Sequence, residues 1–206
     1  MCLMSSYMNY VFQLHPIFKK MMINHSQTIQ ITQEWIQQFV IGLNLCPFAK
    51  LPFKMDKIRY TIFEGNDLES FLKAILDELM FLKDSEAAVC ETSLLIHPEI
   101  FNDFTEYWDF QEVVEEILEE SDLDGVIQVA TFHPDYQFAD TRKTSPENYT
   151  NRSPFPMLHF LREDSVTKAV DTYPDIDDIP EHNIRKMNDL GIFKIKNMLN
   201  DIIGKN

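Results

Sequence analysis

The fold is decided by a short apolar run that a His-Pro pair closes, TSLLIHP at residues 92–98. Five uncharged residues in a row are typical of a buried strand, and a proline cannot donate the next hydrogen bond of a sheet. A second run of the same form, VIQVATFHP at residues 126–134, follows Gly125. The sequence therefore predicts two strands, over 92–96 and 126–132, that end in the same way.

One acidic helix separates these two strands. Apolar residues within 108–118 recur at helical spacing and glutamates cover the opposite side, which predicts a helix with one solvated face. Upstream, residues 58–63 alternate like a strand and residues 68–82 have the pattern of a helix. Alternating strands and helices imply right-handed crossovers between parallel strands. We therefore expect a mostly parallel sheet.

The outer parts of the chain add further elements. We expect a helix over 31–43, a strand of open direction over 157–161, a short helix over 165–170 and a closing helix over 180–203. Thr28 is the expected cap of the first helix, Pro47 ends it, and Gly191 weakens the middle of the last one.

These elements predict a single α/β (or α+β) domain over residues 23–206, with a mostly parallel sheet of about four strands packed with helices. Residues 1–22 precede the first patterned segment, and we expect them to be an N-terminal extension outside the fold.

The composition restricts the class of protein. The chain has 206 residues, 45% of them hydrophobic, and a formal net charge of −15, which is typical of an acidic globular domain. Such a field repels phosphates and anionic lipids, so we expect neither nucleic acid nor a membrane as partner. Cys2, Cys46 and Cys90 have no paired spacing, which suits a reducing compartment, and we expect a cytoplasmic protein.

The common cofactor and catalytic signatures are absent. The chain has five glycines and no GxGxxG, GxxxxGK[ST], HExxH or GxSxG pattern, so we expect no cofactor and assign no metal ligands. An alternative is a metal-binding protein that uses His, Cys and Asp, because imidazole, thiolate and carboxylate suit zinc or iron.

The two His-Pro pairs are the first candidate site. Strands that run in the same direction place His97 and His133 at one edge of the sheet, where open α/β folds bind ligands, and each proline is expected to expose the preceding imidazole. His133 is the candidate general acid/base with Asp135 as its orienting partner, because an ordinary histidine pKa of ~6.5 suits proton transfer. The alternative is that each pair only terminates a strand.

Cys46 is the third candidate catalytic residue, because it lies in a turn after a predicted helix and a thiol beside an imidazole is the minimum for thiol catalysis. The end of a helix dipole raises a thiol pKa, and the Leu, Pro and Phe neighbours are equally typical of buried packing.

A polar segment after the second His-Pro pair supplies candidate ligand-binding residues. These are Asn148, Tyr149, Asn151, Arg152 and His159, together with His97. An arginine fork holds carboxylate or phosphate, which predicts a small anionic ligand, and the prolines stiffen the loop. The alternative is that the arginine pairs with one of the 33 acidic residues of the chain.

Four motifs resemble one known family. They are NLCPFAK (44–50), LLIHP (94–98), QVATFHPDYQFAD (128–140) and NYTNRSPFPMLHFLRE (148–163). Together they are similar to the bacterial and plastid family catalogued as a domain of unknown function, number fourteen-fifteen, over about Gln33 to Leu199. The resemblance implies a bacterial cytoplasmic protein and carries no activity.

The patterns favour a small-molecule enzyme or binding protein whose His/Asp/Arg pocket lies at the carboxyl edge of the sheet, and they do not choose between catalysis and binding. The rival is a non-catalytic protein-interaction module with an acidic face.

Overall fold

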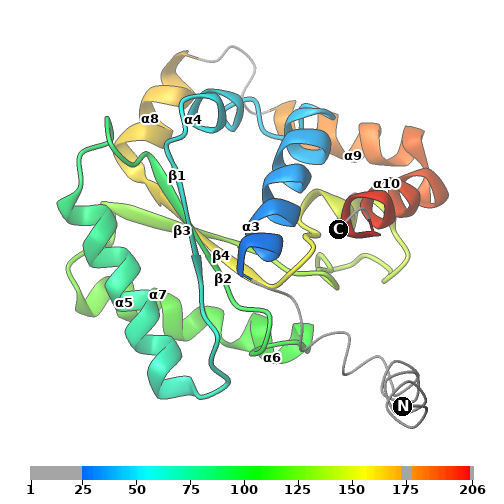
Figure 1. The fold of residues 1–206 in the computed structure, drawn as a ribbon. Coiled ribbons are helices and arrows are strands. Elements are labelled where there is room, and N and C mark those ends of the chain that lie inside the picture. Colours follow the sequence, from blue (N-terminus) through cyan, green and yellow to red (C-terminus); the bar gives the residue numbers. More distant parts are fainter. Residues whose placement is uncertain (1–24, 173–177, 205–206) are drawn as a thin grey trace, which may run out of the picture.

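A four-stranded sheet runs through the middle of the fold, with helices on both faces (Figure 1). The computed structural model describes residues 25–172 and 178–204, so the expected extension 1–22 lies outside the described residues. The strands are β1 (Ile58–Ile62), β2 (Thr92–Ile96), β3 (Ile127–Phe132) and β4 (Met157–Arg162), in the order β1-β2-β4-β3.

The expectation of a mostly parallel sheet is wrong. β1 pairs with β2 in parallel, but β4 pairs antiparallel with both β2 and β3. The chain returns from β3 to β4 through a loop, and an antiparallel pair needs no helical crossover, so β4 inserts between the two strands that end in His-Pro. Because both are antiparallel to β4, β2 and β3 run in the same direction, and His97 and His133 follow them at the same edge of the sheet, as expected.

One face of the sheet is covered by α5 (Leu68–Asp84), α6 (Phe104–Asp109) and α7 (Gln111–Glu120). The side chains of Asp67 and Asp103 cap α5 and α6 by accepting backbone N–H bonds. The helix expected over 108–118 is divided between α6 and α7 at Phe110. Leu95, Leu158 and Phe160 are among the strand residues that face these helices.

The opposite face is covered by α3 (His25–Glu34), a π-helix η1 (Trp35–Ile41), α9 (Ile179–Leu190) and α10 (Ile192–Gly204). Leu94, Ile96 and Met157 alternate with the residues of the first face and point into this second core. The Thr28 cap was predicted wrongly, because Thr28 lies within α3, where its carbonyl accepts a bond from the Thr32 hydroxyl.

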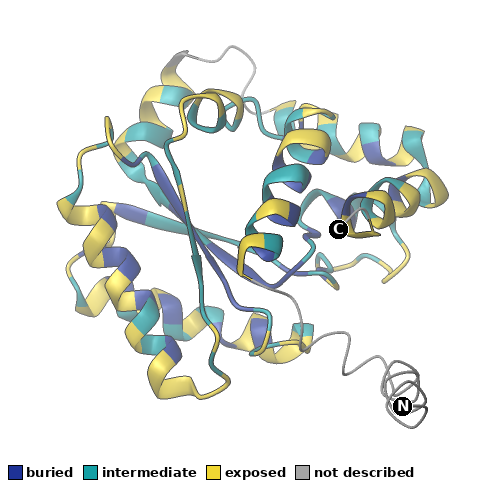
Figure 2. Ribbon diagram, viewed as in Figure 1, coloured by how far each residue is buried: buried dark blue, intermediate teal, exposed yellow. Residues whose placement is uncertain are grey.

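The remaining elements are α4 (Lys50–Lys54), a 3₁₀ helix η2 (Pro146–Thr150) and α8 (Glu163–Thr172). The closing helix expected over 180–203 is two helices, α9 and α10, because the chain turns at Gly191, whose φ of +74° favours glycine. Figure 2 shows the burial that results, with β2 buried, β1 and β3 mostly half-buried, and the outer sides of the helices exposed.

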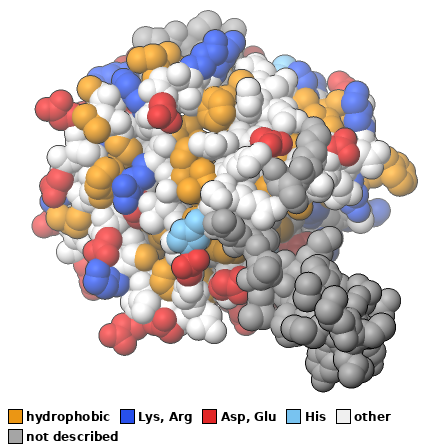
Figure 3. Space-filling model, viewed as in Figure 1, with side chains coloured by type: hydrophobic (Ala, Val, Ile, Leu, Met, Phe, Trp, Pro, Cys, Tyr) orange, Lys and Arg blue, Asp and Glu red, His pale blue; other side chains and the backbone are white. Residues whose placement is uncertain are grey.

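The described helices include none that is long and apolar enough to cross a membrane. On the face shown in Figure 3, apolar side chains are scattered among acidic and basic ones.

Candidate functional site

A pocket of about 630 Å³ lies beside the end of β3, between η1, the loop after β3 and α9. Its apolar lining includes Val40, Leu45, Phe132, Phe138 and Ile184. Its polar lining includes Cys46, Thr141, Glu147, Thr150, Asn151 and Asn183. A cavity of this size, mostly apolar with a few polar groups, has the usual form of a small-molecule site.

Three of the four family-like motifs meet in this pocket. Cys46 comes from the first motif, Phe132 and Phe138 from the third, and Thr150 with Asn151 from the last. The π-helix η1 ends just before the motif at residues 44–50, and π-helical turns recur at functional sites. The motif at residues 94–98 contributes no lining residue among those that the structure describes.

Cys46 is half-buried in the pocket wall. Burial raises the pKa of its thiol, and the backbone N–H groups of Phe48 and Ala49 offset part of the rise. The thiol is therefore neutral near pH 7, and no imidazole lines the described part of the pocket to activate it. The geometry places Cys46 in the pocket wall, and the described lining offers no base that could activate its thiol.

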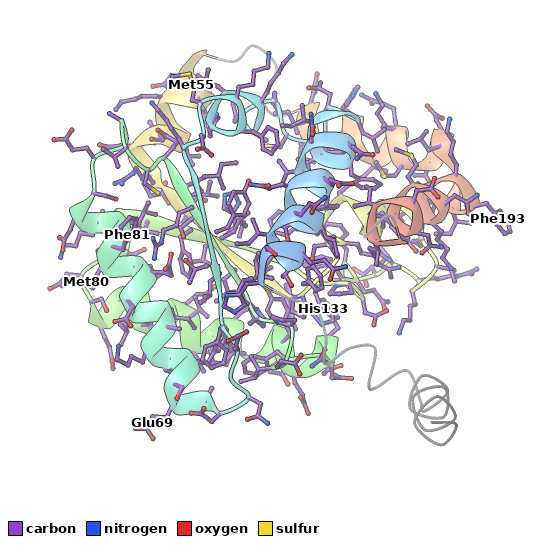
Figure 4. All side chains as sticks on the ribbon, in the orientation of Figure 1. Met55, Glu69, Met80, Phe81, His133 and Phe193 are labelled. Atoms are coloured by element: carbon purple, nitrogen blue, oxygen red, sulfur yellow. The ribbon has the colours of Figure 1, made fainter. Side chains whose placement is uncertain are left out.

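His133 lies inside the fold, whereas the expectation was an exposed imidazole (Figure 4). Only 1% of the residue is exposed, because the ring packs against Phe104 and Tyr107. Its Nδ1 accepts the backbone N–H of Asp135 at 3.0 Å, and its Nε2 lies 3.1 Å from the Phe101 carbonyl oxygen. Burial lowers its pKa, so the ring is neutral and both nitrogens are engaged.

Asp135 contacts His133 through its backbone and not through its carboxylate, which lies 3.5 Å from Nζ of Lys143. The orienting contact expected between the carboxylate and the imidazole is therefore replaced by a backbone hydrogen bond.

His97 is fully buried, again in contrast to the exposed position expected, because the rings of Phe71 and Tyr107 cover it. Its Nδ1 lies 3.1 Å from the Ile100 carbonyl oxygen, and its Nε2 has no partner among the described residues. Burial lowers its pKa to about 4. The two histidines thus hold neighbouring carbonyls of one loop, at Ile100 and Phe101.

Arg152 is buried beneath the loop and binds backbone oxygens. Its Nε donates to the Tyr136 carbonyl at 3.0 Å and its Nη2 to the Lys143 carbonyl at 2.8 Å. Its guanidinium carbon lies 4.4 Å from the centre of the Tyr149 ring. Among the described residues these contacts involve no carboxylate, and Arg152 is not part of the described pocket lining. The anion site expected at Arg152 stays a prediction.

Asn148 supports the pocket wall from behind. Its Oδ1 accepts bonds from the Phe138 backbone and the Thr141 hydroxyl, and its Nδ2 donates to the Arg142 carbonyl. Asn151 reaches the cavity itself, and its Nδ2 lies 3.4 Å from the Thr131 carbonyl oxygen.

His159 lies on β4, within the sheet and away from the described pocket lining. The Thr92 hydroxyl donates to the Phe160 carbonyl, so Nε2 of His159 donates to that hydroxyl, at 2.6 Å. Burial lowers the pKa of His159 to about 4, which is consistent with a neutral structural ring.

Glu147 and Asn183 are among the lining residues that the sequence analysis did not name. Glu147 directly precedes the motif that begins at Asn148, and this position was the signal in the sequence that could have identified it as a lining residue. Asn183 comes from α9, where the sequence gives no signal; its Nδ2 donates to the Leu45 carbonyl at 2.8 Å, and its Oδ1 is buried without a partner in the described structure. Within residues 25–172 and 178–204, no group of three or more His, Cys, Asp and Glu is placed to hold a metal ion.

Comparison with the curated proteins and with the solved structures finds no match. A family model described as "Protein of unknown function (DUF1415)" matches residues 27–197, which include all four motifs. The resemblance that these motifs predicted is confirmed, and the chain belongs to the DUF1415 family of proteins of unknown function.

Proposed function

We propose that this protein binds a small molecule in the pocket beside the end of β3. The observation that supports it is the convergence of segments far apart in the sequence, from Cys46, Phe138, Asn151 and Asn183, on one cavity of about 630 Å³. Three of these segments are the motifs that also carry the family resemblance.

The lining determines how such a molecule is held. Val40, Leu45 and Ile184 offer apolar surface to the body of a ligand, and burial of that surface supplies affinity. Cys46 and Asn151 offer a thiol and an amide that can orient it. Binding is favoured over thiol catalysis, because both nitrogens of His133 are engaged elsewhere and the Cys46 pKa is raised.

The test uses Cys46 as a reporter of occupancy. In a Cys2→Ser protein, Cys46 is the half-exposed thiol and Cys90 is buried. A compound library is screened by thermal shift, and each compound that raises Tm is tested for slowing the alkylation of Cys46. We expect stabilising compounds to protect Cys46, and Cys46 carrying N-ethylmaleimide to lose the thermal shift.

The matched control moves the thiol out of the pocket. Phe193 on α10 is 84% exposed and points outward, so a Cys2→Ser, Cys46→Ser, Phe193→Cys protein carries a reporter far from the lining (Figure 4). Its alkylation rate should not respond to the compounds. Compounds that stabilise the fold but leave Cys46 as reactive as before would place binding elsewhere and refute the proposal.

A further inference from the structure

We infer that the pocket selects a ligand with a positively charged nitrogen on an apolar body; this rests on the proposed function and names the class of ligand. The observation is that Glu147 is the only charged residue in the lining that the structure describes.

The carboxylate of Glu147 has no hydrogen bond or ion pair to any other described residue. The residue is half-buried at the beginning of η2, and its backbone carbonyl accepts the Thr150 hydroxyl. By contrast, the carboxylate of Asp135 lies beside Lys143, and that of Glu181 lies beside Arg185. An ammonium group bound in the cavity would be the partner of opposite charge for this carboxylate.

Aromatic side chains strengthen the preference for a cation. Phe132 and Phe138 line the same cavity, and the negative face of an aromatic ring attracts an ammonium group. The aliphatic wall formed by Val40, Leu45 and Ile184 suits the remaining apolar part of the ligand.

No basic side chain belongs to the described lining of the cavity. Near Glu147 in the sequence, Arg152 donates to backbone carbonyls and Lys143 lies beside Asp135. Arg142 is exposed and lies outside that lining. The positive end of the α9 dipole lies at the cavity, and Asp178 at the N-cap offsets it. The net charge of −15 attracts cations to the whole surface.

A matched set of probes tests the charge of the ligand. 3-Phenylpropylamine, 3-phenylpropanol and 3-phenylpropanoate share one apolar body and differ in the charge of the polar end. Binding to the full chain is followed by Trp35 fluorescence in a Trp108→Phe background, because the Trp35 ring lies 5.3 Å from Phe132 of the pocket. We expect the amine to bind about tenfold more tightly than the alcohol, and the carboxylate to bind most weakly.

The variant Glu147→Gln removes the charge and keeps the shape of the side chain. It should weaken amine binding about tenfold and leave alcohol binding unchanged. Glu181→Gln is the control, because Glu181 lies near the cavity but outside its lining and pairs with Arg185, and it should leave the affinities of the amine and the alcohol unchanged.

The outcomes separate the two proposals. If the alcohol or the carboxylate binds as tightly as the amine and protects Cys46, or if Glu147→Gln leaves the amine preference intact, the inferred charge selection is overturned and the pocket stands. If the amine binds without protecting Cys46, or if none of the three probes binds, both the charge selection and the proposed pocket are overturned.

Discussion

The backbone N–H of Asp135 donates to Nδ1 of His133 at 3.0 Å. Since a backbone amide can only donate, Nδ1 carries no proton, and Nε2 carries the proton that is donated to the Phe101 carbonyl. His97 holds the neighbouring carbonyl of Ile100. The two His-Pro sequences therefore end two strands and fasten one loop, which corresponds to the structural alternative for both pairs.

Replacing His133 should destabilise the fold. His133→Phe keeps a ring in the aromatic environment but removes both hydrogen bonds, and we expect unfolding in urea to show a loss of about 2–4 kcal/mol. His182→Phe, at an exposed position of α9, is the control and should change stability by about 0.5 kcal/mol or less. Equal stability of the two variants would show that His133 is free for another role.

Stability should fall as the pH is lowered through the range of the buried histidines. Burial lowers the pKa of His97 from 6.5 to about 4, so below pH 6.5 the unfolded chain takes up the proton and the folded chain does not. The stability that neutral His97 contributes is fully present above pH 6.5, falls between pH 6.5 and 4, and does not change further below pH 4. The total fall in the free energy of unfolding is about 3 kcal/mol.

The measurement compares urea unfolding of the wild type and His97→Phe from pH 7 to pH 4. The difference isolates the histidine from carboxylates that titrate in the same range, and the wild type should lose about 3 kcal/mol more than the variant. The free energy of unfolding of His159→Phe should also depend less on pH than that of the wild type, because burial lowers the pKa of His159 to about 4 as well. Parallel profiles for wild type and His97→Phe would contradict the prediction.

The sequence predicts local structure well where a strong local signal exists. β2 begins and ends as predicted, because its apolar run is short and a proline closes it. The place of β4 could not be predicted, because the loop after His133 fixes neither its direction nor its neighbours. The π-helical form of residues 35–41 and the division at Phe110 depend on packing and have no periodicity of their own.

The roles expected of the candidate site residues stay predictions, but their positions can be compared with the pocket. Cys46 and Asn151 line the pocket, whereas His133 and Arg152 lie outside its described lining. Residue type indicates that an arginine needs acceptors, but not whether they are carboxylates, a ligand or backbone oxygens. The choice is made by the path of the loop, which brings the Tyr136 carbonyl to Arg152.

Arg152→Ala should be destabilising. The change leaves the carbonyls of Tyr136 and Lys143 without their donor and removes the contact with the Tyr149 ring, so we expect a loss of about 2–4 kcal/mol in urea unfolding. Arg185→Ala, which removes an exposed arginine from the i,i+4 pair with Glu181, is the control and should cost about 0.5 kcal/mol or less. A stable Arg152→Ala protein that no longer responds to phosphate would instead support the anion site.

Gly42 connects the π-helix to the pocket, and its replacement should damage both. A Cβ at this position would lie 2.2 Å from the Gln38 carbonyl oxygen, so the backbone of η1 must shift to admit Gly42→Ala. Val40 and Leu45, on either side of Gly42, line the cavity. We therefore expect a loss of about 1–3 kcal/mol in stability and weaker binding of 3-phenylpropylamine.

Gly204→Ala is the matched control, because a Cβ there has no atom within 4 Å and the residue is exposed at the end of α10. It should leave both unfolding in urea and amine affinity unchanged. If Gly42→Ala behaved like this control, the π-helix would have room for a methyl group and would not fix the pocket wall. If it lost stability but kept full affinity, the wall would be held by other contacts, such as the bond from Asn183 to the Leu45 carbonyl.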